Sequence, residues 1–225
     1  MIDWPDLTAL WLSLKLAVIT TVLLLVISAP LAWWLARTRS GAKPWVEAVV
    51  ALPIVLPPTV LGFYLLLLLG PEGWLGGLWV RLTGDALTFS FTGLVIASMV
   101  YSLPFVVQPL QNGFAAVNPR LQEAARTLGA KPLAVFFTVT LPLAKAGVLT
   151  AAVLGFAHTL GEFGVVLMVG GNIPGETKVI AIEIYNQVEM LNYQQAHVLS
   201  AILLLLAFAL IFAMFLINHR SRRHV

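Results

Sequence analysis

The chain has 225 residues, of which 60% are hydrophobic and only 10% are charged. A soluble domain typically has about 25% charged residues, so this chain has too few charges to cover a water-exposed surface. A disordered chain is excluded because disorder requires low hydrophobicity. The sequence contains no cysteine, which excludes disulfides, thiolate zinc sites and cysteine nucleophiles. The composition therefore indicates an integral membrane protein.

Five apolar segments are each long enough to cross a bilayer, which takes about 20 residues of helix. We expect these spans at about residues 12–36, 46–69, 89–116, 133–169 and 196–217. The fold class that they predict is an all-α membrane protein in a single domain, residues 1–225. The first segment also has some features of a signal peptide. Its apolar stretch is too long for one, however, its head is acidic, and a basic stretch follows it instead of a cleavage site.

Two of these segments contain residues that bend or break a helix. Pro53, Pro57 and Pro58 interrupt the second segment, and each proline removes a backbone donor. A bend beside a transport path and a simple packing kink explain these prolines equally well. The fourth segment is too long for one straight span, and its glycines offer places to bend it. The polar stretch that follows it, up to about residue 195, is expected to lie at the membrane surface or to re-enter between spans.

The cations alternate between the two sides of the expected membrane. The loops on one side carry only Arg81 and Lys178, while Lys15 and Lys145 lie within spans. The other side carries nine cations: Arg37, Arg39, Lys43, Arg120, Arg126, Lys131, Arg220, Arg222 and Arg223. Cytoplasmic loops are enriched in Lys and Arg, which predicts an N-terminus outside, a C-terminus in the cytoplasm and an odd number of crossings. The net charge of +3 then needs no nucleic acid as a partner.

The loop between the third and fourth segments predicts a short helix over about residues 119–129. Asn118 is a good N-cap and Pro119 fits the first helical position. Gly129 fits the left-handed position that ends a helix, and Pro132 prevents its continuation. So short a helix is marginal in water, so we expect it to dock on something. The spacing alone leaves open whether it docks on another protein or lies on lipid headgroups.

The same loop resembles the EAA loop of bacterial ABC importer permeases. That family has EAA, three residues, G, nine residues, I, one residue and LP, and the match here consists of Glu123, Ala124, Ala125, Gly129, Val139, Leu141 and Pro142. Only Val139, in place of isoleucine, departs from the pattern. The resemblance implies the type I importer fold of this family, in which the loop forms a coupling helix docked in a cleft of the ATPase subunit. It also implies that Glu123, Ala124, Ala125, Arg126, Gly129, Leu141 and Pro142 carry the ATPase coupling.

Further segments resemble the molybdate branch of this family. They are Leu52–Gly62, Ala124–Ala130, Phe136–Leu143, Leu160–Gly164 and Gly171–Thr177. The resemblance implies an oxyanion importer of a bacterial inner membrane, most similar to molybdate permeases. Sulfate, thiosulfate and tungstate remain alternative substrates, because sulfate permeases have similar motifs.

The resemblance and the sequence together imply several partners. No nucleotide-binding motif occurs in the sequence, so ATP hydrolysis is expected on a separate chain and no cofactor on this one. Five spans without an internal repeat would form half a pathway, which predicts a homodimer. Two ATPase subunits on the cytoplasmic side and an oxyanion-binding protein outside would complete the transporter in the bilayer.

An oxyanion path needs hydroxyl, amide and backbone N–H groups rather than strong cationic sites. The candidate pathway or gate residues are Pro57, Pro58, Thr59, Ser102, Gln108, Thr159 and Glu162, with Gln111 and Asn112 as further polar candidates. Each polar residue has an alternative role, a hydrogen bond to a neighbouring helix. A carboxylate near the bilayer is expensive and binds a dianion poorly, so we expect Glu162 to be structural or gating. It would form a hydrogen bond to His158 or a structural contact across a subunit interface. The His158–Glu162 pair has too few ligands for a metal site.

Two other function classes fit the sequence less well. An ion-coupled secondary transporter usually shows inverted repeats and intramembrane charges, whereas here only Glu162 is available. A membrane-embedded enzyme would need a constellation of nucleophile and base, but the four histidines are scattered. The expected function is the one that the resemblance implies, a permease that moves an oxyanion by alternating access.

Overall fold

The computed structural model describes residues 7–222, with side chains up to residue 219. Within this part of the chain all regular elements are helices. Asp3 and Asp6, which make the head of the first segment acidic, and Arg223, which contributes to the predicted orientation, lie outside the described residues. Arg220 and Arg222 are described by their backbone only.

Three helices are long and apolar enough to cross a membrane without a break. They are α1 (Thr8–Arg37), α5 (Phe91–Ala115) and α12 (Tyr193–Arg222). They contain most of the expected first, third and fifth spans. Pro30 lies inside α1, and Pro104 and Pro109 lie inside α5, without ending either helix. Ser90 caps α5, because its hydroxyl accepts a hydrogen bond from the Gly93 N–H at 3.1 Å.

The second expected span is not one straight helix. It consists of α2 (Lys43–Val55) and α3 (Pro58–Leu69), whose axes differ by 112°. The break falls at Leu56 and Pro57, where extended backbone separates the two helices. A proline cannot donate the hydrogen bond that would continue α2. The interruption expected from the prolines of this segment is therefore present, as a sharp turn between two helices.

The fourth expected span is divided further. Its first part comprises α7 (Pro132–Val135), the π-helix η1 (Phe136–Thr140) and α8 (Leu141–Leu143). After a bend of 76° it continues as α9 (Lys145–Leu160). A second break at Gly161–Phe163 leads to α10 (Gly164–Gly170). If each bent pair counts as one span, the described residues contain up to five candidate spans.

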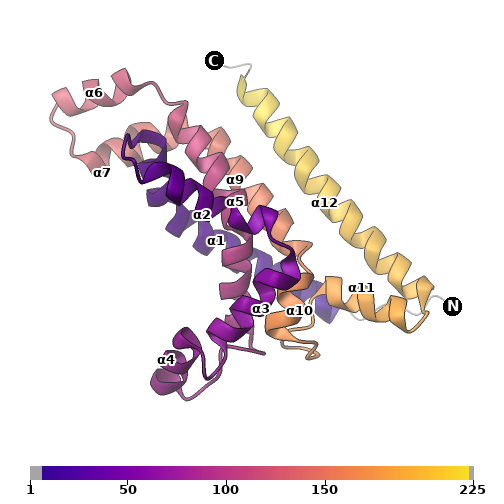
Figure 1. Cartoon of the computed structure of the whole chain (residues 1–225). Coiled ribbons are helices and arrows are strands. Elements are labelled where there is room, and N and C mark those ends of the chain that lie inside the picture. Colours follow the sequence, from indigo (N-terminus) through magenta and orange to yellow (C-terminus); the bar gives the residue numbers. More distant parts are fainter. Residues whose placement is uncertain (1–6, 223–225) are drawn as a thin grey trace.

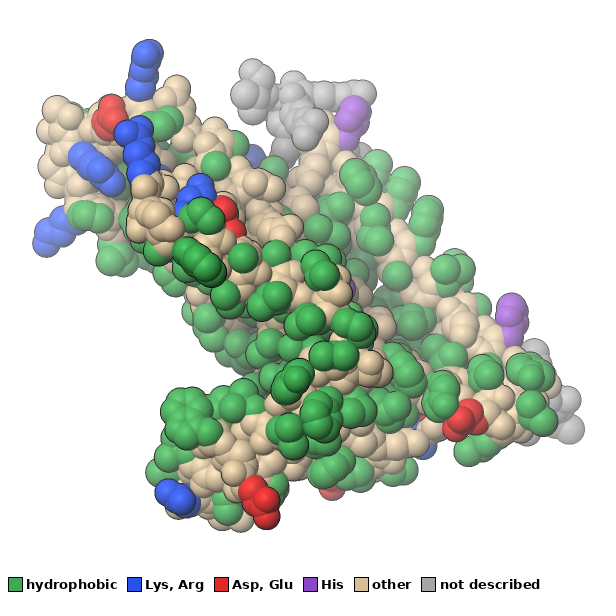
Figure 2. All heavy atoms as spheres, in the orientation of Figure 1, with side chains coloured by type: hydrophobic (Ala, Val, Ile, Leu, Met, Phe, Trp, Pro, Cys, Tyr) green, Lys and Arg blue, Asp and Glu red, His purple; other side chains and the backbone are tan. Residues whose placement is uncertain are grey.

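The connecting segments form short helices at both ends of the bundle. The helix α6 (Pro119–Thr127) lies near one end, toward the C-terminal end of α12, whereas α4 (Trp74–Thr83) and α11 (Ile180–Glu189) lie near the other (Figure 1). Lys and Arg side chains gather around the end that carries α6, and apolar side chains cover the middle of the face shown in Figure 2. This distribution agrees with a bilayer around the middle of the bundle.

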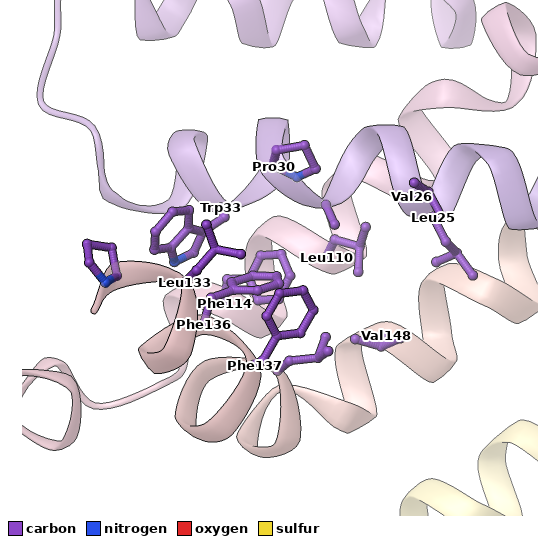
Figure 3. Close-up of a pocket in the computed structure, with 13 residues that line it drawn as sticks. Leu25, Val26, Pro30, Trp33, Leu110, Phe114, Leu133, Phe136, Phe137 and Val148 are labelled. Carbon is purple, nitrogen blue, oxygen red and sulfur yellow. The ribbon is translucent and has the colours of Figure 1, made fainter. Parts of the chain in front are cut away.

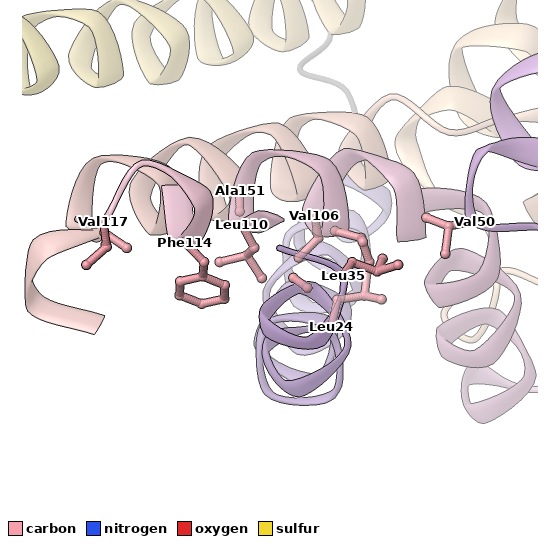
Figure 4. Packing of buried hydrophobic residues seen from close by; sticks show 11 residues of the cluster. Leu24, Leu35, Val50, Val106, Leu110, Phe114, Val117 and Ala151 are labelled. Atoms are coloured by element: carbon pink, nitrogen blue, oxygen red, sulfur yellow. The ribbon is translucent and has the colours of Figure 1, made fainter. Parts of the chain in front are cut away.

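The core lies where α1, α5 and α9 pack against one another. Leu24, Leu35, Val106, Phe114 and Ala151 belong to one buried apolar cluster in this region (Figure 4). Two further clusters lie around α10 and join it to α1, α3, α5 and α11. Lipid is as apolar as these side chains, so close packing rather than the hydrophobic effect holds such helices together.

Small residues allow that close packing between α5 and α9. A Cβ atom on Gly147 would lie 2.7 Å from the Gly113 Cα and 2.9 Å from the Pro109 oxygen. Across the same pair of helices, a Cβ on Gly155 would lie 2.5 Å from a methyl group of Val106. The backbones of α5 and α9 approach this closely only because glycine occupies these positions.

Candidate functional site

The short helix α6 is capped at both ends by the residues that the sequence predicted. The side-chain oxygen of Asn118 accepts a hydrogen bond from the Arg120 N–H at 3.0 Å. At the other end Gly129 has a φ of +88°, and its N–H donates to the Arg126 carbonyl. The Ala130 N–H donates to the Ala125 carbonyl at 3.1 Å, which completes a Schellman motif. Caps at both ends allow a helix of nine residues to keep its shape outside the bundle.

The surface of α6 is largely free in this chain. Glu123 and Ala124 are exposed and Ala125 is half-buried, while Gln122 is buried against the bundle. Leu121 is 50% exposed and Leu128, directly after the helix, is 88% exposed. These exposed apolar side chains are available for contact with another protein or with lipid headgroups. The structure thus leaves the expected coupling residues of α6 accessible to a partner.

The second half of the EAA-like motif lies outside α6. Helix α6 rests on α7 and η1, and Leu141 and Pro142 follow in α8. Leu141 is half-buried against the apolar cluster of α1, α5 and α9, whereas Pro142 is exposed. Leu141 therefore connects the segment under α6 to the core of the bundle. The sequence motif did not reveal this division into a surface part and an anchoring part.

The two helix breaks lie side by side. Helix α3 packs along α10, and a Cβ on Gly164 would lie 2.7 Å from the Cβ of Pro58. The Pro57–Pro58 break of one segment thus meets the Gly161–Phe163 break of the other. Broken helices inside a membrane are tolerated where the chain lines a cavity or is buried in protein. This meeting point combines four of the expected pathway or gate residues. Pro57, Pro58 and Thr59 are exposed in the single chain, whereas Glu162 is buried.

Glu162 is buried and caps the start of α10. It is 5% exposed, and its Oε1 accepts a hydrogen bond from the Val165 N–H at 2.8 Å. This is the structural role expected for the residue, but His158 is not the partner. The His158 ring stacks on Phe105 with ring centroids 3.8 Å apart, and its Nδ1 lies 3.0 Å from the Ser102 hydroxyl. The suggested His158–Glu162 hydrogen bond is therefore wrong.

The expected pathway residues divide into buried and exposed ones. Ser102 and Thr159 are buried and their hydroxyls lie 2.9 Å apart, so they join α5 to α9. Gln111 donates a hydrogen bond to Glu47 at 2.7 Å, which joins α5 to α2. Gln108 is exposed on α5. A side chain that lines a path between two copies must be exposed in the single chain. Gln108 is exposed in this way, whereas Ser102 and Thr159 are not.

A polar hollow lies between α5, α9 and α12, and sequence reasoning found only one of its polar residues. The hollow has a volume of about 310 Å³ and is lined in part by Asn112, Thr150 and Asn218. The Asn218 side chain donates a hydrogen bond to the Thr150 hydroxyl at 3.3 Å. Thr150 is an isolated polar residue in an apolar segment, which is the signal that would have identified it. Asn218 lies where the apolar run ends before His219, so the sequence does not distinguish it from the polar tail.

No group of three or more His, Asp or Glu side chains that could hold a metal ion occurs in residues 7–222. The hollow offers hydroxyl and amide groups, and the helix breaks add backbone groups, the Thr59 hydroxyl and the buried Glu162 carboxylate. Hydroxyl, amide and backbone N–H groups are the ones among these that suit an anion. Such groups can solvate an anion weakly along a path.

The sequence is similar to that of bacterial transport permeases. The molybdenum transport system permease protein ModB of Azotobacter vinelandii is 58% identical over 210 residues, which cover 93% of each chain. The corresponding protein of Haemophilus influenzae is 39% identical and covers 82% of this chain and 80% of its own. A probable sulfate transport system permease protein of Zygnema circumcarinatum is 34% identical over 88% of this chain and 69% of its own.

The fold is similar to that of solved ABC transporter chains. A chain of the methionine ABC transporter MetNI in an inward-facing conformation matches with a TM-score of 0.70 and 21% identity over 94% of both chains. A chain of the bacterial alginate ABC transporter, solved with a periplasmic protein bound to alginate pentasaccharide, matches with a TM-score of 0.72 and 19% identity. That match covers 96% of this chain and 78% of the other. Residues 25–224 match the family described as binding-protein-dependent transport system inner membrane component, and the chain belongs to this family.

Proposed function

We propose that this chain is the membrane-spanning subunit of an ATP-driven importer that moves molybdate into the cytoplasm. The observation that carries the proposal is α6, a short helix that is capped at both ends and presents the EAA-like residues on its free surface. The 58% identity to a molybdenum transport permease supports molybdate as the substrate. The likeness to a sulfate permease keeps sulfate as the second candidate.

The proposed subunit is a single domain of five spans with the N-terminus outside and the C-terminus inside. It acts as a homodimer, with two ATPase subunits at the α6 end and a binding protein at the α4 and α11 end. The exposed polar residues Gln108 and Asn112 then face the matching residues of the second copy across the path. ATP binding brings the two ATPase subunits together and moves the α6 helices with them. The breaks beside Pro58 and Gly164 act as hinges: the helix segments on either side of them reorient when the transporter switches between the inward-open and outward-open states.

Reconstitution tests this function directly. The permease is purified with the ATPase and the binding protein that neighbouring reading frames encode, and is then placed in proteoliposomes. We expect the binding protein loaded with molybdate to stimulate ATP hydrolysis and to support molybdate uptake, measured by mass spectrometry of the lumen. Uptake without ATP, or uptake abolished by collapsing the ion gradient alone, would favour the secondary transporter. Stronger stimulation by the sulfate-loaded protein would favour sulfate.

A pair of variants tests the role of α6. Ala124→Arg places a long side chain on the exposed face of α6, whereas Ser40→Arg places the same side chain on an exposed loop between α1 and α2. We expect Ala124→Arg to lower the amount of ATPase that co-purifies with the permease by about tenfold. This corresponds to a loss of about 1.4 kcal/mol of binding free energy through steric misfit at the interface. Ser40→Arg should leave co-purification unchanged. Equal behaviour of the two variants would show that α6 is not the contact.

A further inference from the structure

An apolar cavity opens between α1, α5 and the α7–η1 segment, near the end of the bundle that carries α6 (Figure 3). Its volume is about 580 Å³. Pro30 and Trp33 of α1, Phe114 of α5, and Leu133 and Phe136 of the α7–η1 segment contribute to its lining. The volume falls within the range of about 300–1,000 Å³ that is typical of ligand pockets. The cavity is separate from the polar hollow and from the two helix breaks.

Two buried donor atoms without an acceptor belong to Trp33, which lines this cavity, and to Arg37, which lies one helical turn further along α1 and outside the lining. Among the described side chains, Trp33 Nε1 and Arg37 Nη2 are both buried and have no hydrogen-bond partner. The Arg37 guanidinium lies over the Trp33 ring, 4.9 Å from the ring centroid, and the Trp33 ring packs edge-on against Phe136. A buried donor without an acceptor is costly, so an acceptor that reaches both groups would be bound favourably.

The charges around these donors favour an anion. Arg126 of α6 lies close enough to Arg37 for the two positive charges to repel each other. The ion pairs among the described residues are Lys43–Glu47 and Lys178–Glu183, so neither arginine has a carboxylate partner there. Lys131 directly precedes Pro132, which lines the cavity. An anionic group placed between these cations would offset their repulsion.

We propose that this cavity binds an anionic phospholipid of the inner leaflet, with an acyl chain in the apolar part and the phosphate on Trp33 and Arg37. The indole N–H and the guanidinium N–H groups donate to phosphate oxygens, and the lining side chains contact the chain. A second copy of this protein is a poorer occupant, because its α6 end would bring further cations to Arg37. The inference depends on the proposed orientation for the leaflet but not on the transported substrate.

Native mass spectrometry of the permease–ATPase complex tests this site. The purified complex is titrated with dioleoyl phosphatidylglycerol, dioleoyl phosphatidylcholine or a short-chain phosphatidylglycerol, and the Kd of the first retained lipid is measured. We expect the anionic long-chain lipid to bind most tightly. Arg37→Gln should weaken its binding by about tenfold and Trp33→Phe by a few-fold, as expected for losing a charged and a neutral hydrogen bond to phosphate. The neighbouring exposed residues provide matched controls, Arg39→Gln and Trp34→Phe, which should change the Kd by less than twofold.

Several outcomes would overturn the proposal. Equal affinity for the two long-chain lipids would show that the phosphate–arginine contact does not select the lipid. If Arg37→Gln and Arg39→Gln raised the Kd of the anionic lipid equally, general surface charge and not this site would attract the lipid. If the short-chain lipid bound as tightly as the long-chain lipid, the cavity would not contribute to binding. A disulfide between two copies carrying Leu133→Cys, formed without retained lipid, would assign the cavity to a second copy. Trp33→Phe and Arg37→Gln each remove a different donor from the site. If one variant fails to fold, the other still tests the proposal.

Discussion

Several polar residues inside the spans hold the helices together. Ser102 and Thr159 join α5 to α9, Ser13 joins α1 to the start of α11 by accepting the Ile180 N–H at 2.7 Å, and Glu162 caps α10. Each of these groups would be costly if it were left unpaired in an apolar environment. The sequence identified most of these residues as polar exceptions but did not indicate their partners, because the partners come from distant helices.

Glu162 provides a prediction at the residue scale. In Glu162→Gln the amide oxygen can still accept the Val165 N–H, so we expect wild-type stability in detergent. In Glu162→Ala that buried N–H loses its acceptor, which should cost about 1–2 kcal/mol. Thermal unfolding of the purified protein measures both changes. The exposed Glu176→Ala is the control and should unfold like the wild type. A Glu162→Gln variant as unstable as Glu162→Ala would mean that the negative charge, and not the cap, is required.

At the scale of elements, the bends are the main difference between the expectation and the structure. The prolines indicated where the second segment is interrupted, and the glycines of the fourth segment include Gly161 at its second break. The sequence did not indicate the bend of 76° at Ala144, nor the size of the 112° turn in the second segment. The packing of α3 along α10 and of α9 along α5 sets these angles. They depend on contacts between distant segments, so the local sequence does not predict them. The caps of α6 were predictable because Asn118 and Gly129 act on their own neighbours in the chain.

The crossing of α5 and α9 gives a prediction at the same scale. Gly147→Ala would place a methyl group 2.7 Å from the Gly113 Cα, so the helices must move apart. We expect a loss of about 1–3 kcal/mol, as for other overpacked sites. Gly161→Ala is a matched control, since its nearest neighbour would be a carbonyl oxygen at 3.6 Å and its φ is −89°. Thermal unfolding measures both variants. Equal destabilisation by Gly147→Ala and Gly161→Ala would contradict the close approach of α5 and α9.

At the scale of the whole molecule, the distribution of the cations predicts that the α6 end lies in the cytoplasm. The chain has no cysteine, so single cysteines report orientation without background. We expect Glu176→Cys to react with a membrane-impermeant maleimide in intact spheroplasts, and Ser40→Cys to react only after permeabilisation. Gel mobility of the labelled protein measures both. The reverse pattern would invert the orientation, and labelling of both cysteines in intact spheroplasts would contradict an odd number of crossings between them.

The position of α12 has a consequence for biosynthesis. The three buried apolar clusters within the described residues draw their members from residues 16–182, and only 6% of the apolar window of α12 is buried in the chain. Every residue of these clusters has therefore been translated before α12 leaves the ribosome. The preceding helices can assemble without waiting for it, and α12 then enters a bilayer that already holds the packed bundle.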